Sequence, residues 1–549
     1  MIRERVPVLI VGAGYAGLSA AALLAWRGVR CMLVERRGST SQLPKAHGLN
    51  RRSMEVLRVV EGLEEALHLS SGADANDSTL IIAERVVGPI IATLVTKSSL
   101  DLTLVSPAKV CTAGQDRVEP VLLRYAEENG AKVRFSTRLI HFRADSEGVE
   151  AIVRDERTGA ETTVFADYLI AADGAEGAIR EAGNVKMEGP GVLAHTISIL
   201  FEADLESVLP SRGLVLYYLR NPSFSGALVT CDDSNRFQLN VEFNPARDKA
   251  SDFDEQRCVE LVRDAVGISD LELKICDIWP WKMSALMADR MSFGRVFLAG
   301  DCAHVMPPVG GLGGQTAIQD AADLAWKLAM VIKGHAAPAL LDSYEPERRP
   351  VARIAIARQI ANYVERLLPE RQELRIPGDE YDMLSTSIGY RYRSAAIITE
   401  ADDDGSAVEN PAHASGAPGT RLPHVWLERG EKRLSSHDLI GRNFVLFAGP
   451  EGKSWIEAAQ EIANSSAPLC CYRLSVDVAD PFGEFLSRLG LSSSGAVLVR
   501  PDGYIAWRSR ESQQRALSLL EASFALVRGM SAATRPHETQ VEWILEGRL

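Results

Sequence analysis

Three glycines close to the amino terminus have the spacing of a dinucleotide-binding turn. A buried-strand pattern over residues 8–11 runs into Gly12, Gly14 and Gly17, and a helical pattern follows over 18–27. In such a turn the first glycine permits a tight bend, the second lets the backbone approach a pyrophosphate, and the third lets helix and strand pack closely. The free N–H groups of the helix N-terminus favour phosphate. The sequence therefore predicts that this turn binds a dinucleotide.

An acidic residue follows at the distance that such a site requires. A second apolar strand over residues 31–34 ends in Glu35, which lies 21 residues beyond Gly14. A carboxylate there can accept hydrogen bonds from ribose hydroxyls. The glycine motif alone also occurs in ordinary turns of α/β domains. Strand, helix, second strand and acid in register favour an adenine dinucleotide.

A second group of residues with chemical potential lies far downstream. A buried strand over 296–299 ends in Gly300 and Asp301, and a Pro-Pro turn and a glycine-rich loop over 310–314 lead to a helix near Gln315. The acid can hold a ribityl hydroxyl, and the loop and helix N-terminus can face the polar edge of an isoalloxazine ring. Simple nicotinamide dehydrogenases need no such segment, so the two groups together indicate a flavin.

A third motif completes a family pattern. A strand over 168–172 is followed by Asp173-Gly174 and a helix. The three ordered motifs resemble those of the single-component FAD-dependent aromatic hydroxylases, the class A monooxygenases with the fold of p-hydroxybenzoate hydroxylase. The longer similarity is to the phenol hydroxylase and aklavinone-type polyketide hydroxylase branch. It extends through residues 44–55, 115–119 and 344–349 and covers nearly the whole chain.

The resemblance implies a cofactor, an electron donor and a reaction. It implies FAD, with NADPH or NADH as a transient donor, and hydroxylation of a phenol or aromatic polyketide through a flavin C4a-hydroperoxide. Some positions depart from the family pattern, since Lys45 stands where many relatives have arginine, Gly177 replaces a common serine and Gln315 a common asparagine. The positions that match on FAD are Gly12, Gly14, Ala16, Gly17, Glu35, Arg36, Lys45, Gln115, Asp173, Asp301, Pro308, Gly311, Gly313 and Gly314.

His47 is the candidate catalytic base. It stands where phenol hydroxylase relatives carry a polar acid or base residue, and a histidine titrates near neutrality. Deprotonation of a phenol makes its ring more nucleophilic. The alternative is a loop histidine that hydrogen-bonds the backbone or packs against the flavin. Contacts with the substrate are expected from His47, Tyr217, Tyr218 and Met283.

Composition excludes several classes of function. The 549 residues suffice for two or three domains, and a formal charge of −13 argues against nucleic acid or an anionic membrane as partner. The eight cysteines show no metal-ligand spacing, so no metal site is expected. The first strand begins too early for a signal peptide, and no apolar run reaches the roughly 18 residues of a membrane helix. A cytoplasmic enzyme is expected, and a homodimer is the habit of the family.

The expected fold is α/β, with a Rossmann-like FAD-binding domain interrupted by a mostly antiparallel substrate domain, and a thioredoxin-like domain at the carboxyl end. Period-2 runs such as residues 237–243 predict the antiparallel sheet. Adjacent Cys470 and Cys471 lack the redox spacing of an oxidoreductase. The expected boundaries are 1–72, 109–185 and 291–400 for FAD, 73–108 and 186–290 for substrate, 401–419 for a linker and 420–549 for the last domain.

Two other activities are compatible with these motifs. The same scaffold can perform a Baeyer–Villiger insertion or an epoxidation on a polyketide. A flavin-binding reductase without monooxygenase activity is the second alternative, although the chain shows no membrane-binding or quinone-channel feature.

Overall fold

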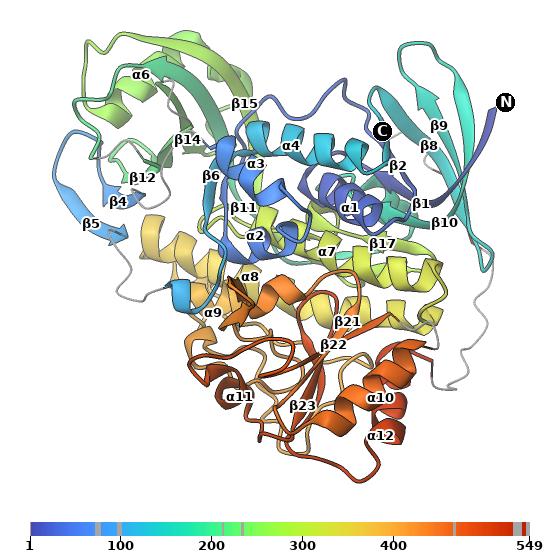
Figure 1. Ribbon diagram of the computed structural model, residues 1–549. Coiled ribbons are helices and arrows are strands. Elements are labelled where there is room, and N and C mark those ends of the chain that lie inside the picture. Colours follow the sequence, from blue (N-terminus) through green and yellow to red (C-terminus); the bar gives the residue numbers. More distant parts are fainter. Residues whose placement is uncertain are drawn as a thin grey trace.

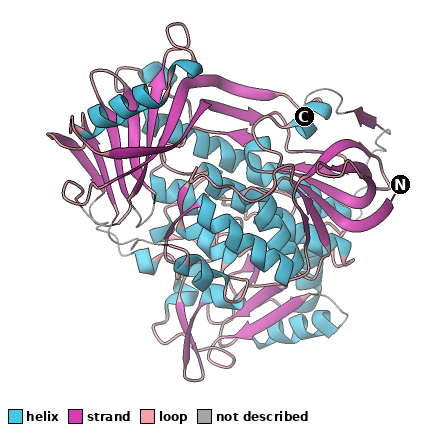
Figure 2. Cartoon of the chain, turned by 90° about the horizontal axis from the view of Figure 1, so that it is seen from above, coloured by secondary structure: helices cyan, strands magenta, loops and turns pink. Residues whose placement is uncertain are grey.

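The structure is a computed structural model that describes residues 2–71, 78–95, 102–210, 213–231, 235–464, 468–530 and 541–544. Three main sheets surround a group of central helices (Figure 1). Viewed from above, these helices lie between the first and second sheets (Figure 2). The helices are α1 (Tyr15–Trp26), α2 (Arg51–Leu57), α3 (Leu63–Leu69), α4 (Gln115–Glu128), α5 (Ala178–Ala182), α6 (Glu255–Val266), α7 (Gly313–Ile332), α8 (Tyr344–Leu367), α9 (Met383–Ile388), α10 (Lys453–Asn464), α11 (Glu484–Leu489) and α12 (Ala516–Val527).

The first sheet brings the predicted motifs to one edge. Its parallel strands are nearly continuous apolar runs because both faces are covered. The register pairs Val11 with Val34 and with Ala171, and Ala171 with Leu298, so the segments that follow these strands lie together. The strand order is β25 (Val541–Ile544), β8 (Thr137–Ala144), β9 (Val149–Asp155), β10 (Glu161–Ala171), β1 (Ile2–Val11), β2 (Cys31–Val34) and β7 (Lys132–Arg134), with β17 (Val296–Leu298) beside β10 and β16 (Ser292–Phe293) beside β17.

The second sheet is the mostly antiparallel sheet that the sequence predicts. Its one parallel pair joins β12 to β4. One face packs on α6 and the other is turned to α8, so successive residues of a strand face different helices. The strand order is β18 (His304–Val305), β15 (Leu273–Ala288), β11 (Met187–Ala203), β14 (Arg236–Phe243), β13 (Ser225–Thr230), β12 (Val215–Arg220), β4 (Thr79–Ala83) and β5 (Ile90–Val95).

The third sheet forms the carboxyl-terminal domain at the bottom of Figure 1. α10, α12 and the end of α7 share a core with it. The order is β22 (Leu469–Arg473), β21 (Phe444–Ala448), β23 (Ala496–Val499) and β24 (Ile505–Ser509), and only β21 and β22 are parallel. Two small sheets pair β3 (His47–Leu49) with β6 (Cys111–Gly114) and β19 (Trp426–Arg429) with β20 (Lys432–Ser435).

Two features differ from the expected organisation near the carboxyl end. The segment 401–419 is no free linker, because Val408 forms a β-bridge with Tyr390 and the Gly419 N–H donates to the Ile505 carbonyl. The short strand β25 lies within the expected last domain, 420–549, but it belongs to the first sheet, where it pairs with β8. No described helix is long and apolar enough to cross a membrane.

Candidate active site

The amino-terminal glycine turn has room for a ligand at one position only. Gly12 has a φ of +105°, and a β-carbon there would lie 2.2 Å from the Ala172 carbonyl oxygen. A β-carbon on Gly17 would lie 1.8 Å from the Gly12 carbonyl oxygen. At Gly14, in contrast, no atom lies within 4 Å of such a carbon. The turn is thus closed against strand and helix and open where a pyrophosphate would lie, so it fits the dinucleotide half of FAD.

Glu35 is held by the same turn. Its Oε2 accepts the Ala13 N–H at 2.9 Å, and its Oε1 accepts the Arg37 N–H at 2.8 Å. Each carboxylate oxygen has a further lone pair, so both remain able to accept a ribose hydroxyl. The neighbouring Arg36 is exposed and lies 3.8 Å from Glu176, so its contact with FAD stays a prediction.

Lys45 and Asp301 reach the same edge from different segments. Removal from bulk water and the nearby charge of Arg37 lower the pKa of Lys45. Three carboxylates, those of Glu119, Asp301 and Glu35, oppose this shift. Residues predicted to hold the two ends of the cofactor therefore lie within electrostatic reach of one another.

Gln115 begins α4 beside this group. Its backbone N–H donates to the Ala46 carbonyl at 2.9 Å, and its Nε2 donates to Glu119 Oε1 at 2.5 Å. Glu119 Oε2 accepts the Ser41 N–H at 2.7 Å. Glu119 is buried, and this bond fixes the Gln115 amide at the start of the helix.

Asp173 binds groups of its own chain. Its Oδ2 accepts the Ile179 N–H at 3.0 Å, and the Cys302 thiol also hydrogen-bonds to the carboxylate. Arg180 joins the two motifs by donating to the Cys302 carbonyl at 3.1 Å. Gly177, which replaces the family's serine, has a φ of +49°, a backbone conformation that glycine adopts readily. Direct contact between Asp173 and FAD stays a prediction.

The glycine loop before α7 is fastened by amide side chains. Gln315 Nε2 donates to the Gly48 carbonyl at 2.9 Å, and its Oε1 accepts the Asn50 N–H at 3.0 Å. From α8, Gln359 accepts the Leu312 N–H at 2.9 Å and Asn362 donates to the Val309 carbonyl at 3.1 Å. The sequence motifs do not include Gln359 and Asn362, which form a polar i, i+3 pair on the buried face of α8.

The glycines of this loop differ in their surroundings. At Gly311, with a φ of +68°, no atom lies within 4 Å of a built β-carbon, so the backbone is open there. A β-carbon on Gly314 would lie 2.7 Å from the Tyr15 ring, and one on Gly313 would lie 3.6 Å from Met306. The neighbouring Pro308 is exposed. This pattern leaves the backbone of the loop accessible to a planar ring while its helical end packs against α1.

His47 lies on β3, opposite Gly114 of β6. The Gln315 bonds to residues 48 and 50 hold this strand against the start of α7. The structure therefore places the candidate base beside the glycine loop. Its role as a base stays a prediction.

The two candidate tyrosines face opposite sides of the second sheet. Tyr218 packs with Met283, Val309 and Tyr363 on the side of α8, and its hydroxyl accepts a hydrogen bond from Arg366 at 2.7 Å. Tyr217 is buried in the core under α6. The expectation that Tyr217 contacts substrate is therefore corrected, because the period-2 alternation of a strand turns it away from the glycine loop.

Polar residues outside the sequence motifs lie on the α8 side of this sheet. The Trp281 indole donates to Ser198 Oγ at 2.8 Å, and Ser198 and Gln238 both hydrogen-bond to Asn240. Glu242, on the same strand as Asn240, accepts a hydrogen bond from the Tyr363 hydroxyl. The alternation of residues 237–243 indicates that Gln238, Asn240 and Glu242 share one face of the strand. It does not indicate which face of the sheet that is.

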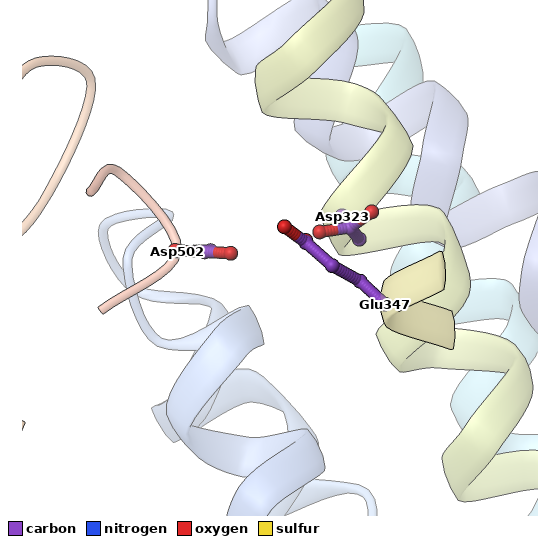
Figure 3. Close-up of side chains that lie close together, drawn as sticks. All are labelled: Asp323, Glu347 and Asp502. Atoms are coloured by element: carbon purple, nitrogen blue, oxygen red, sulfur yellow. The ribbon is translucent and has the colours of Figure 1, made fainter. Parts of the chain in front are cut away.

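A cluster of three carboxylates lies away from these groups, between the central helices and the third sheet. Figure 3 shows Asp323, Glu347 and Asp502 pointing toward one another. Lys327 Nζ lies 2.7 Å from Asp323 and 2.8 Å from Glu347, and Arg500 binds both oxygens of Glu347 at 2.6 and 2.8 Å. The chain supplies the cations for this cluster, so we assign no metal ion to it.

Comparisons with known proteins agree with this geometry. A family described as an FAD binding domain matches residues 5–359, and one described as the carboxyl-terminal part of aromatic-ring hydroxylases matches 415–527. Aklavinone 12-hydroxylase RdmE of Streptomyces purpurascens is 39% identical over 527 residues, which cover 94% of this chain and 98% of the relative. A 4-methyl-5-nitrocatechol 5-monooxygenase of a Burkholderia species is 39% identical over 526 residues, 92% of this chain and 94% of the relative.

Among solved structures, a ternary complex of aklavinone-11 hydroxylase with FAD and aklavinone superposes with a TM-score of 0.90 at 38% identity. The match covers 96% of this chain and 100% of that one. The resemblance and the fold class that the motifs implied are confirmed. The chain belongs to the FAD-dependent aromatic-ring hydroxylases, in the aklavinone hydroxylase and polyketide hydroxylase branch, and is an FAD-dependent monooxygenase.

Proposed function

We propose that this enzyme hydroxylates a phenolic ring of a fused aromatic polyketide. The substrate C–H becomes C–OH, one atom of O₂ enters the ring, and the other leaves as water. NADPH or NADH provides two electrons together with a proton from solvent. When bound, FAD supplies the redox chemistry that links the donor to O₂.

The width of the apolar face on the second sheet carries this proposal. Of the six consecutive strands from β15 through β4, all except β14 contribute apolar side chains on the side of α8, and β5 adds Ala92. On this side β14 contributes the polar Gln238, Asn240 and Glu242. Neighbouring strands are about 4.8 Å apart, so the face extends over about 24 Å, far more than a single ring needs. The relatives named for aklavinone hydroxylation support a fused substrate. The relative named as a nitrocatechol monooxygenase is, in contrast, named for a single-ring substrate. The members of this face are Leu80, Ile82, Ala92, Leu193, Ala194, Leu216, Tyr218, Ala227, Trp281 and Met283.

The chain's own residues have distinct tasks in this reaction. The turn at Gly14 and the carboxylate of Glu35 would hold the adenine half of FAD, and Lys45, Gln115 and Asp301 would hold its middle. The open backbone around Gly311 would face the flavin ring. The apolar face excludes water, which protects reactive oxygen species from unproductive breakdown.

Turnover with a panel of aromatic compounds tests the proposal. NADH and NADPH oxidation by the purified FAD-loaded enzyme is followed with hydroxyanthraquinones and with single-ring phenols, and products are weighed by mass spectrometry. We expect faster oxidation with the fused compounds and a product heavier by one oxygen with its carbon skeleton intact. Hydroxylation of single-ring phenols alone would overturn the fused substrate. A product heavier by one oxygen in which a ring ketone has become a lactone would point to Baeyer–Villiger insertion instead.

A further inference from the structure

We propose that Glu242 is the base that removes the proton from the phenolic hydroxyl of the substrate, with Thr196 beside it as a second polar contact. This inference rests on the proposed function, because it assumes a phenolic substrate on the α8 side of the second sheet. It assigns a task to a carboxyl group that the sequence motifs do not include.

Glu242 lies at the centre of the proposed substrate face. It pairs in register with Thr196 of the neighbouring strand, and residues paired in this way have side chains on the same face of a sheet. Thr196 in turn pairs with Trp281. The Tyr363 hydroxyl donates to Glu242 from α8, and the adjacent Asn362 holds the glycine loop through Val309. One helix therefore positions both the carboxylate and the glycine loop that is expected to face the flavin.

Two oxygen atoms at this position have no hydrogen-bond partner among the described residues. These are Glu242 Oε1 and Thr196 Oγ1, and both are buried atoms. The large majority of buried side-chain polar atoms in proteins have a partner, so two such oxygens on neighbouring strands can accommodate a polar ligand. A carboxylate oxygen accepts a phenolic O–H, and the threonine hydroxyl can donate to a second oxygen of the same molecule.

The surroundings of Glu242 suit proton transfer near neutral pH. Burial raises its pKa to about 7, although the hydrogen bond from Tyr363 opposes the shift. Charged groups on this face of the sheet are Arg236 of the same strand, which pairs with Asp116, and Arg220 of β12, which donates to the Arg366 carbonyl. From α8 and the segment after it, Arg366 binds Tyr218, and the charges of Arg371 and Glu370 act on Tyr363. A base with a pKa close to the working pH is the most effective one.

The proton transfer balances within the overall reaction. The O–H bond of the substrate breaks, its proton forms a bond with a Glu242 oxygen, and the electron pair stays on the phenolate. The negative charge thus passes from the carboxylate to the ring, which becomes more nucleophilic toward electrophilic oxygen. The proton departs with the atom of O₂ that leaves as water, and Glu242 is a carboxylate again.

The substitution Glu242→Gln tests this role, because it preserves the shape and the bond with Tyr363 but removes the base. We expect kcat for hydroxylation to fall about 100-fold or more, with KM little changed, and the rise of kcat through about pH 7 to disappear. Matched controls are His47→Ala, for the competing base, and Glu202→Gln. Glu202 is an exposed carboxylate of the same sheet, paired with Lys274 at 3.3 Å, and its variant is expected to keep full activity.

A spectroscopic measurement detects deprotonation of the bound phenol without turnover. 2-Hydroxyanthraquinone, whose phenolate absorbs at longer wavelength than the phenol, is bound to the oxidised holoenzyme at several pH values. We expect the phenolate band with wild type and with Glu202→Gln, and its loss with Glu242→Gln.

The outcomes distinguish this inference from the proposed function. Loss of the band only in His47→Ala, an unchanged band in Glu242→Gln, or no band with wild type would each overturn the role of Glu242. An enzyme that forms the phenolate through Glu242 but hydroxylates no aromatic compound would leave this role standing and contradict the proposed function. Measured FAD content and melting temperature confirm that each variant is folded.

Discussion

Buried polar side chains have partners of opposite charge at the contact between domains, whereas some on the substrate face have no hydrogen-bond partner among the described residues. At the contact between α7, α8 and the third sheet, the carboxylates of Asp323, Glu347 and Asp502 meet the cations of Lys327 and Arg500. On the α8 side of the second sheet, the Glu242 and Thr196 oxygens have no hydrogen-bond partner among the described residues. Both regions lie in the protein interior, and α8 contributes to each.

The difference separates a structural role from a ligand-binding one. A buried charge is tolerated when a partner compensates for its lost hydration, and removing one partner leaves the other without compensation. An unpartnered buried oxygen instead reduces stability, and it is retained where a ligand completes its bonding. The domain contact should therefore respond to substitution through stability, and the substrate face through binding and turnover.

Arg500→Met is expected to have the largest effect on stability. It leaves the carboxylates of Glu347 and Asp502 without the guanidinium that binds both, and breaking a buried ion pair in this way typically costs about 3–5 kcal/mol. Denaturant unfolding of the holoenzyme measures the loss. Arg510→Met is the control, because Arg510 is half exposed, and its pairs with Glu400 and Asp402 should contribute at most about 1 kcal/mol. Equal losses in the two variants would contradict the structural role of the cluster.

Acid should weaken the packing of the carboxyl-terminal domain on α2 through His437, a neutral and largely buried histidine that lies 3.8 Å from Glu55. Burial, and then the charge of Arg421, lowers the pKa of His437 to about 3. Above pH 6.5 the histidine is neutral in both folded and unfolded chains, so it adds no pH dependence. Below pH 6.5 the unfolded chain binds a proton that the folded chain refuses, so stability falls until the pH reaches the folded pKa. At pH 5 this amounts to about 2 kcal/mol.

The variant His437→Gln isolates this effect from other titrating groups. Asp323, whose pKa burial raises to about 7, acts in the opposite direction in both proteins and cancels from the comparison. The gap in unfolding free energy between wild type and variant should shrink as the pH falls from 7.5 to 5. A gap that stays constant over this range would show that His437 is not held neutral.

The sequence predicted the parts of the site that depend on local pattern. Gly12, Gly17 and Glu35 lie within one strand–helix–strand unit, so their spacing carries the information about backbone approach and hydrogen bonding. The charge cluster was not predictable in this way, because Arg500 and Glu347 are 153 residues apart. The sequence around each residue does not indicate its partner. The packed state of residues 401–419 likewise depends on contacts with distant strands.

On the substrate face, local sequence pattern is not sufficient to predict the site. Because side chains alternate along a strand, Tyr217 and Tyr218 face opposite sides of the sheet, and residues 238, 240 and 242 share one side. Which side faces the flavin depends on where α6 and α8 pack, and this is a property of the tertiary fold. The unpartnered oxygen of Glu242 is visible only after all neighbouring donors have been placed.

Thr196→Val is expected to have the smallest effect on stability and gives the sharpest form of the comparison. Valine keeps the shape of threonine but lacks the hydroxyl, and at this position the hydroxyl is buried without a partner among the described residues. Stability should stay the same or rise by about 1 kcal/mol, because no hydrogen bond is lost. KM for the aromatic substrate should rise about 5- to 10-fold, since one contact worth about 1 kcal/mol is removed.

The matched control is Thr137→Val in the first sheet. Thr137 is equally buried, but its hydroxyl donates to the Phe135 carbonyl at 3.1 Å. Its removal should cost about 1 kcal/mol of stability and leave KM unchanged. The reverse pattern, with Thr196→Val destabilising and KM unaffected, would mean that the Thr196 hydroxyl belongs to the fold. That result would contradict the assignment of the unpartnered Thr196 hydroxyl to substrate binding.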